Sequence, residues 1–352
     1  MSPVTASTGG GPVAPTRRST QRLRGTGPAA RLGLIVGVGG VAALFLIRGI
    51  TAGTDPGLPN VMQDLLTLSY SVVIESLPFV ILGVVLSILV QVWIPDAWII
   101  RVLPANPTLR RVVVSMLGVF LPVCECGNLP LARGLIAKGF SVSESMTFLL
   151  AAPIVNPITI ITTHQAFGFD DGILVARLLG GFAIANLIGW LYSKHPDQES
   201  LLTSRFAAEC RVEEEPQRAS GVEKSLDLFV REMSIIMPAL LLGALAAGAV
   251  QVLVPRSILV ELGSNPIWSI VAMMVLAFII SVCSSVDAFF ILPFAGIFMP
   301  GSIATFLIFG PIVDIKMLAM MRTTFTWRTL AQVIAVVALV SALIGLVVNY
   351  AA

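Results

Sequence analysis

Long apolar stretches separated by short polar segments dominate the chain from residue 32 onward. Crossing the hydrocarbon core of a bilayer takes about 20 helical residues, and most of these stretches have that length. A helix also satisfies its own backbone hydrogen bonds in lipid. The pattern therefore predicts an all-α polytopic membrane protein with about nine hydrophobic segments. They cover residues 32–48, 65–94, 112–138, 144–164, 172–192, 226–253, 267–298, 302–320 and 328–350.

Two of these stretches are interrupted by polar residues. Residues 112–138 hold two apolar halves around Cys-Glu-Cys-Gly-Asn, and residues 267–298 hold two halves around Cys-Ser-Ser-Val-Asp. Each stretch is too long for one comfortable span. We expect broken or re-entrant helical hairpins whose polar tips lie inside the membrane, surrounded by protein or a watery cavity.

Composition supports the same class. The 352 residues are 56% hydrophobic and 12% charged, whereas soluble domains are about 25% charged. This balance excludes an ordinary soluble enzyme, a disordered chain, a coiled coil and a nucleic-acid binder. The chain also lacks the phosphate loop G-x-x-x-x-G-K-[ST] and the catalytic motifs H-E-x-x-H and G-x-S-x-G. We therefore expect no enzyme, no ATP-driven pump and no cofactor.

The polar segments divide the chain. Residues 1–31 carry five arginines and no acidic residue, which predicts a disordered basic cytoplasmic tail. A signal peptide with its apolar region at 32–47 is the alternative, but no clear small-residue cleavage site follows it. The remaining parts are an N-terminal transmembrane helix with an outer loop (32–64), a first transmembrane repeat (65–192), a cytoplasmic linker (193–225) and a second transmembrane repeat (226–352).

Lysines and arginines predict the orientation. With the tail inside and the hairpins not crossing, most basic residues fall on the inner side. The loops 49–64 and 165–171 fall outside and contain acidic residues but no Lys or Arg. Arg48, Arg177 and Arg256 lie near the outer side and are exceptions. We expect a multi-pass protein of the cell (inner or plasma) membrane with a cytoplasmic N-terminus.

The two halves share an internal repeat. Thr-Phe-Leu-Leu-Ala-Ala-Pro-Ile-Val-Asn at 147–156 matches Thr-Phe-Leu-Ile-Phe-Gly-Pro-Ile-Val-Asp at 305–314. An odd number of crossings in each repeat predicts that the second is inverted, as in many secondary transporters. Further positions recur at an offset of 160 residues: Pro78, Gly83, Gln91 and Pro95 correspond to Pro238, Gly243, Gln251 and Pro255.

The first tip carries the most distinctive chemistry. Cys124, Glu125 and Cys126 lie within three residues, followed by Asn128, at membrane depth where polar groups are costly. Cysteine thiolates suit soft ions such as Cu(I), Zn(II) or trivalent arsenic. The repeat-equivalent Cys283 would add a third sulfur if the two tips meet. Alternatively, each cysteine is a small apolar core residue.

Other polar positions lie near the expected midplane. Asn156 and Asp314 end the matched motif, and Lys316 follows two residues later. Asp314 and Lys316 form either a structural ion pair or part of a substrate or proton site, and Asp287 presents the same choice. Glu75 is a candidate for proton coupling because an ionisable residue inside a span is a functional hypothesis by default.

The stretch Pro-Val-Cys-x-Cys-Gly-x-x-Pro-Leu, followed by Pro153-x-x-Asn156-Pro157, resembles the predicted permease family that includes the organoarsenical efflux permeases. The resemblance covers roughly residues 65–350. It implies a multi-pass inner-membrane transporter that binds trivalent organoarsenicals through thiols, here Cys124, Cys126 or Cys283. Glu125 and Asn128 depart from the family's usual small and aliphatic residues, and a carboxylate at the tip favours a cation.

Our leading hypothesis is a secondary-type permease that exports a soft metal or metalloid species through a cysteine-containing midplane site. Its expected partners are the lipid bilayer and a small inorganic or organometalloid substrate, with no nucleic acid. The main rival is an intramembrane thiol redox protein in which Cys124 and Cys126 cycle between dithiol and disulfide. A permease for a non-metal small molecule is the third alternative. The sequence leaves oligomeric state and any accessory subunit open.

Overall fold

The computed structural model describes residues 28–53, 59–95, 103–121, 123–169, 172–213, 221–253 and 265–351. Regular structure in these ranges is helical, apart from one isolated bridge between Leu202 and Phe325. The all-helical expectation is therefore confirmed for this part of the chain. Most of the expected cytoplasmic tail (1–27) and the acidic residues of both outer loops except Asp64 lie outside the described residues.

The helices differ widely in length. The four longest are α1 (Pro28–Gly53), α2 (Asn60–Ile88), α11 (Gly221–Leu253) and α17 (Trp327–Ala351). In the first half the shorter ones are α4 (Pro107–Met116), α5 (Glu125–Ala137), α6 (Val142–Val155), α7 (Pro157–Phe167), α8 (Ile173–Val175) and α9 (Gly181–Ser193). The later ones are α10 (Ser204–Glu213), α13 (Pro266–Ile280), α14 (Asp287–Ile291), α15 (Pro300–Phe309) and α16 (Ile315–Met321).

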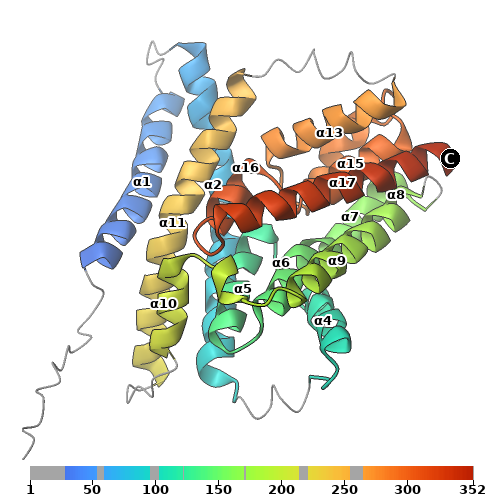
Figure 1. Ribbon diagram of the computed structural model, residues 1–352. Helices are drawn as coiled ribbons and strands as arrows, with labels where there is room; N and C mark the ends of the chain where they lie inside the picture. The colour runs from blue at the N-terminus through green and yellow to red at the C-terminus, as the bar shows by residue number, and fades with distance from the viewer. Residues whose placement is uncertain are drawn as a thin grey trace, which may run out of the picture.

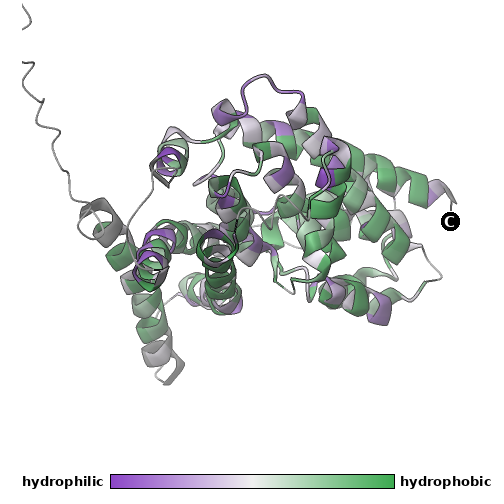
Figure 2. Cartoon of the chain, turned by 90° about the horizontal axis from the view of Figure 1, so that it is seen from below, coloured by the Kyte–Doolittle hydropathy of each residue, from purple (hydrophilic) through white to green (hydrophobic). Residues whose placement is uncertain are grey.

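Five described helical segments are long and apolar enough to cross a membrane, and three shorter apolar helices accompany them. This is fewer than the nine apolar stretches of the sequence, because several stretches break into short helices. Figure 2 shows that apolar residues make up most of the helices, with many of the hydrophilic stretches at helix ends and connections. The spanning segments are Asn60–Trp93, Val142–Phe167, Ile173–Ser193, Gly221–Leu253 and Trp327–Tyr350.

Both interrupted stretches are broken at their polar tips. The first changes from a 3₁₀ turn ending at Val119 to α5, which begins at Glu125. The second leaves α13 through Ser281, whose φ of +52° lies in the left-handed region, and resumes as α14 at Asp287. The prediction of broken helices at these two tips is confirmed.

The helices pack in three groups (Figure 1). Helices α1, α2 and α11 stand side by side, and α2 and α11 run in opposite directions. In the first half α4, α6 and α9 contact one another, and in the second half α13, α15 and α17 do the same. Helix α5 lies between α2 and α6, and α16 lies against both α11 and α5. Helix α5, which begins at the first tip, therefore lies at the junction of these groups.

Two glycines permit close helix approaches next to the broken helices. A Cβ on Gly83 of α2 would lie 2.1 Å from the carbonyl oxygen of Gly127 in α5. A Cβ on Gly243 of α11 would lie 3.0 Å from Cα of Lys316 in α16. Small residues at such crossings let backbones approach closely, which is how helices associate in membranes. Both crossings hold the first residues of a broken helix against a long one.

Candidate functional site

The first tip lies at the start of α5, deep inside the protein. Cys124 is the residue that precedes the helix, and Glu125 is its first residue. Cys124, Glu125 and Cys126 are all at most 2% exposed. The extended backbone of Cys124 (ψ 173°) begins the helix at this point. The tip residues therefore contact protein rather than lipid.

The second tip meets the first. One ligand atom each from Cys124, Glu125 and Cys283 lie within 4.8 Å of one another. The expected proximity of Cys124 and Cys283 is thus confirmed. Cys126 stands outside this group; its thiol donates to Ser76 Oγ on α2 at 3.5 Å. Cys124 also interacts with the Cys126 thiol, so three thiols gather near one carboxylate.

Glu125 is the centre of the hydrogen-bond network. Its Oε2 accepts from the backbone N–H of Ser284 at 3.4 Å, from the Ser284 hydroxyl at 3.1 Å and from the Cys283 thiol at 3.7 Å. Its Oε1 forms an ion pair with Lys316 Nζ at 3.2 Å, and both side chains are 1% exposed. The charge of the Glu125 carboxylate is therefore balanced by Lys316, and both carboxylate oxygens already accept hydrogen bonds.

The ion pair between Asp314 and Lys316, one of the two alternatives from the sequence, does not form in the structure. The ion-pair partner of Lys316 is Glu125 across the site, not the nearby Asp314. Asp314 instead caps α16 by accepting from the N–H of Met317 at 2.5 Å. Its repeat counterpart Asn156 caps α7 through Ile158 N–H at 3.0 Å.

Asn156 also connects the helix break to the tip. Its Nδ2 donates to the carbonyl of Val123 at 3.1 Å, directly before Cys124. This bond fixes the backbone that presents the first thiol. Asn156 is thus placed to position the site rather than to line it.

Asp287 is held by Arg177. The guanidinium donates to both carboxylate oxygens at 2.9 and 2.7 Å, a bidentate geometry, and both residues are almost fully buried. Arg177 also donates to the carbonyl of Ser284 at 3.3 Å and to Thr163 Oγ1 at 2.7 Å. Arg177 is therefore an interior residue, which explains why it violates the charge pattern of the loops.

Two further candidates lie nearby. Glu75 is half-buried on α2, within electrostatic reach of Lys316 and Glu125. Asn128 is fully buried one turn into α5, and neither atom of its amide group has a hydrogen-bond partner among the described residues. A buried amide without partners is costly.

Membrane-length apolar helices around a buried cluster of thiols and ion pairs define a multi-pass membrane protein with a polar interior site. The chain belongs to the predicted permease family, whose model matches residues 61–350.

Three relatives agree with this assignment. The UPF0718 protein YcgR of Bacillus subtilis is 36% identical over 262 residues, covering 73% of this chain and 87% of that protein. A putative two-component membrane permease complex subunit of Streptococcus mutans is 31% identical over 298 residues, covering 83% of this chain and 97% of that protein. The UPF0718 protein YraQ of Escherichia coli matches over 117 residues, 32% of each chain, at 31% identity. No solved structure matches the chain.

Sequence reasoning missed two members of the site. Ser284 is a weak candidate by sequence, because its side chain can bond its own backbone, yet its hydroxyl and N–H both donate to Glu125. Arg177 was noted only as an exception to the charge rule. An arginine inside a span is itself a signal, because such a residue needs a buried acidic partner.

Proposed function

We propose that this chain is a secondary-type permease that exports a soft metal or metalloid species through the site at the two tips. The observation that carries the proposal is the meeting of Cys124, Glu125 and Cys283 within 4.8 Å. Two sulfurs from opposite halves of the chain are a suitable ligand set for a thiophilic centre. Membership of the permease family supports transport as the activity.

The charge balance of the site fits such a substrate. Glu125 and Lys316 cancel each other. A divalent soft metal that displaces two thiol protons leaves the site neutral, and so does a trivalent organoarsenical that exchanges two hydroxyl groups for two thiolates. The first releases two protons and the second releases two waters. Proton release on binding therefore distinguishes the two substrates.

Inverted repeats are the architecture we assign to this permease. The recurring sequence positions, the opposite directions of α2 and α11 in Figure 1, and the matching contacts within α4–α6–α9 and α13–α15–α17 support this assignment. Inverted repeats allow alternating access by exchange of conformations between two similar halves. Glu75, beside the charges of the site, is the candidate for proton coupling.

The cellular setting follows from the same reasoning. The protein resides in the cytoplasmic membrane with its N-terminus inside, as the distribution of Lys and Arg favours. The Streptococcus mutans relative is described as a subunit of a two-component permease complex. This name supports an accessory subunit for the present chain as well.

Transport by reconstituted vesicles tests the proposal. Zn(II), Cu(I) and a trivalent organoarsenical are offered to the wild type and to Cys124→Ser, Cys283→Ser and Cys126→Ser. We expect the first two variants to lose at least about tenfold in transport, since even second-shell partners of metal ligands contribute about that much. Cys126→Ser should lose less, because its thiol lies outside the ligand group.

Cys210→Ser is the matched control, because Cys210 lies on α10 away from the tips, and its transport should equal the wild type. Full transport by the double variant Cys124→Ser, Cys283→Ser would overturn the thiol site. If a disulfide between Cys124 and Cys126 formed and reduced during turnover while no substrate crossed the membrane, the redox alternative would replace transport.

A further inference from the structure

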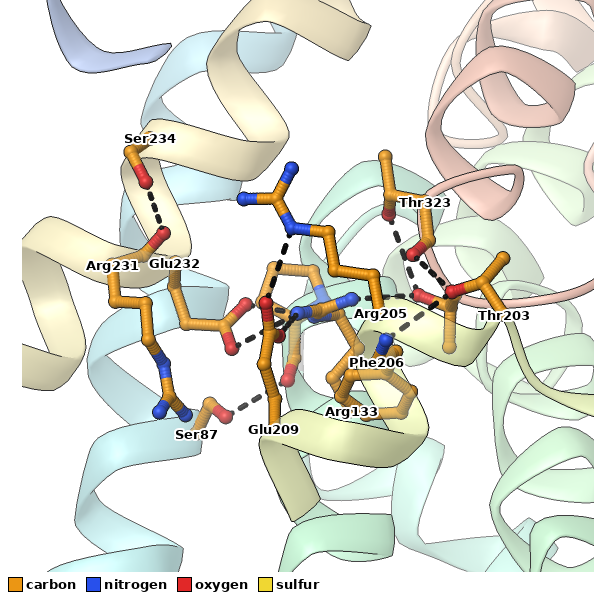
Figure 3. Close-up of polar contacts among 12 residues, drawn as sticks. Ser87, Arg133, Thr203, Arg205, Phe206, Glu209, Arg231, Glu232, Ser234 and Thr323 are labelled. Carbon is orange, nitrogen blue, oxygen red and sulfur yellow. Dashed lines mark hydrogen bonds and ion pairs between the residues drawn. The ribbon is translucent and has the colours of Figure 1, made fainter. Parts of the chain in front are cut away.

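A second buried arginine, Arg133, lies beyond the site along α5 (Figure 3). Its Nε donates to Glu232 at 2.9 Å, and its other nitrogens donate to Glu209 and to Thr324 Oγ1, each at 3.1 Å. The guanidinium also lies over the ring of Phe206, 4.1 Å from its centroid. One side chain thus joins α5, α11, the residues between α16 and α17, and residues 203–213, which we call the α10 segment.

The Arg133 and Arg177 clusters lie on opposite sides of the thiol site. Arg133 follows Glu125 by eight residues, about 12 Å along α5 toward its C-terminal end. Helix α6 starts near that end and returns to Asn156 at the site. Helix α7 then continues for about 10 Å to Thr163, which accepts from Arg177. The thiols therefore lie between the two arginines.

Both clusters bridge the two halves of the chain. Arg133 and Arg177 belong to the first half, whereas Glu232 and Asp287 belong to the second. By contrast, the partly exposed ion pair of Arg110 with Glu144 lies within the first half. A movement that parts the halves on one side of the site must break the arginine cluster on that side.

Ion pairs suit a contact between the two halves that must open and close. A buried ion pair is a weak source of stability, because desolvation offsets most of its attraction, and apolar residues often stabilise as well or better. Once parted, however, both charged partners regain hydration, whereas a parted apolar seam exposes surface to water. Arg177 also lies in a π-helical segment, Ala176–Gly180, a feature frequent at functional sites.

The α10 segment covers the Arg133 cluster from outside. Exposure rises stepwise from Arg133 (1%) and Glu232 (3%) to Glu209 (17%) and Arg205 (64%). The segment is held by backbone bonds to the turn before α17, among them Thr203 N–H to the Thr324 carbonyl at 2.9 Å. This side of the site is therefore closed by the segment between the halves, with Arg133 beneath it.

We propose that these two arginine clusters are the gates of the transport path. Arg133 with Glu232 and Glu209 closes the side of the α10 segment, and Arg177 with Asp287 closes the opposite side. With both clusters formed, the structure is the occluded state, in which Cys124 and Cys283 are each 2% exposed. The assignment rests on the proposed passage of substrate between the two tips.

Accessibility of the site thiols tests the gates without any substrate. A Cys210→Ser background leaves Cys124, Cys126 and Cys283 as the only thiols. A membrane-impermeant, charged methanethiosulfonate is applied to each face of vesicles that hold the full chain. Ser204→Cys, exposed at the start of α10, in a chain without the site thiols identifies the face of the α10 segment.

Arg133→Gln should raise the rate of site labelling about tenfold or more from the α10 face only, which corresponds to about 1.4 kcal/mol of lost closing energy. Arg177→Gln should do the same from the opposite face only. Glu232→Gln combined with Glu209→Gln, and Asp287→Asn, remove the same ion pairs with little change in shape, and they carry the test if an arginine variant fails to fold. Arg110→Gln should leave labelling from both faces unchanged.

Equal labelling from both faces, reversed sides, or no increase in folded variants would overturn the gates. Because no substrate is present, this result is independent of the proposed function. Side-specific labelling in a protein that carries no soft metal or metalloid would retain the gates and reject that substrate class. Metal transport without side-specific labelling would retain the proposed substrate class and reject the gates.

Discussion

The buried pair of Glu125 and Lys316 allows a quantitative test by Lys316→Met. The two charged atoms lie 3.2 Å apart, where two unit charges attract by about 5 kcal/mol at an effective dielectric constant of about 20. Removing one partner leaves Glu125 charged and buried, with Ser284 and Cys283 as its remaining hydrogen-bond partners among the described residues. We expect Lys316→Met to lower the free energy of unfolding by about 3–5 kcal/mol.

A double-mutant cycle separates this pair from a general packing defect. Glu125→Gln removes the opposite charge, so the double variant should be destabilised by less than the sum of the single variants, with a coupling of about 2–3 kcal/mol. Arg110→Gln, which breaks a partly exposed pair, should cost about 1 kcal/mol or less. The measurement is equilibrium unfolding in mixed micelles followed by circular dichroism. Strictly additive single effects, or a cost below about 1 kcal/mol for Lys316→Met, would refute the reasoning.

Three further predictions concern packing, ionisation and positioning. Gly83→Leu should lower the unfolding temperature sharply, since its Cβ would lie 2.1 Å from a backbone oxygen of α5, whereas Gly39→Ala, with nothing within 4 Å, should be neutral or stabilising. Burial raises the pKa of Cys210 from 9.0 to about 11. In a chain without the other cysteines, its alkylation rate should therefore rise roughly tenfold per pH unit up to about pH 11. The stability from this neutral thiol, complete below about pH 9, should be lost between about pH 9 and 11; an alkylation plateau near pH 9 would contradict this. Asn156→Ala removes both the helix cap and the bond to Val123, whereas Asn156→Asp keeps the cap and loses only that bond. Asn156→Ala should therefore reduce transport more, and equal losses would show that the cap is irrelevant.

The sequence was most informative where local rules apply. Prolines, polar tips and apolar lengths predicted helices that break near Cys124 and Cys283, because helix interruption is a local property. The match between Asn156 and Asp314 picked out two equivalent positions, which the structure shows to be helix caps, since Asn and Asp before a helix commonly accept from its first N–H groups. The repeat also indicated which distant thiols would approach each other.

The pairing of charges could not be predicted in the same way. Lys316 is two residues from Asp314, yet its partner Glu125 lies 191 residues away. The choice depends on how α16 crosses α5, which no local pattern specifies. Similarly, the long linker was expected only as a charged connection, whereas its residue Phe206 is buried against Arg133. Tertiary contacts of single aromatic residues in polar segments leave no periodic signal.

Three ion pairs that join the two halves within the described part of the chain also bear on the order of biogenesis. Glu125, Arg133 and Arg177 all precede their partners Lys316, Glu232 and Asp287 by 99 to 191 residues. At roughly 5–20 residues per second, a ribosome needs at least about 5–20 s to supply even the nearest of these second-half partners. During that interval the newly made first half contains charged residues that lipid does not accommodate. We therefore expect the first half to stay in contact with water or a chaperone at the insertion machinery until the second half has been made.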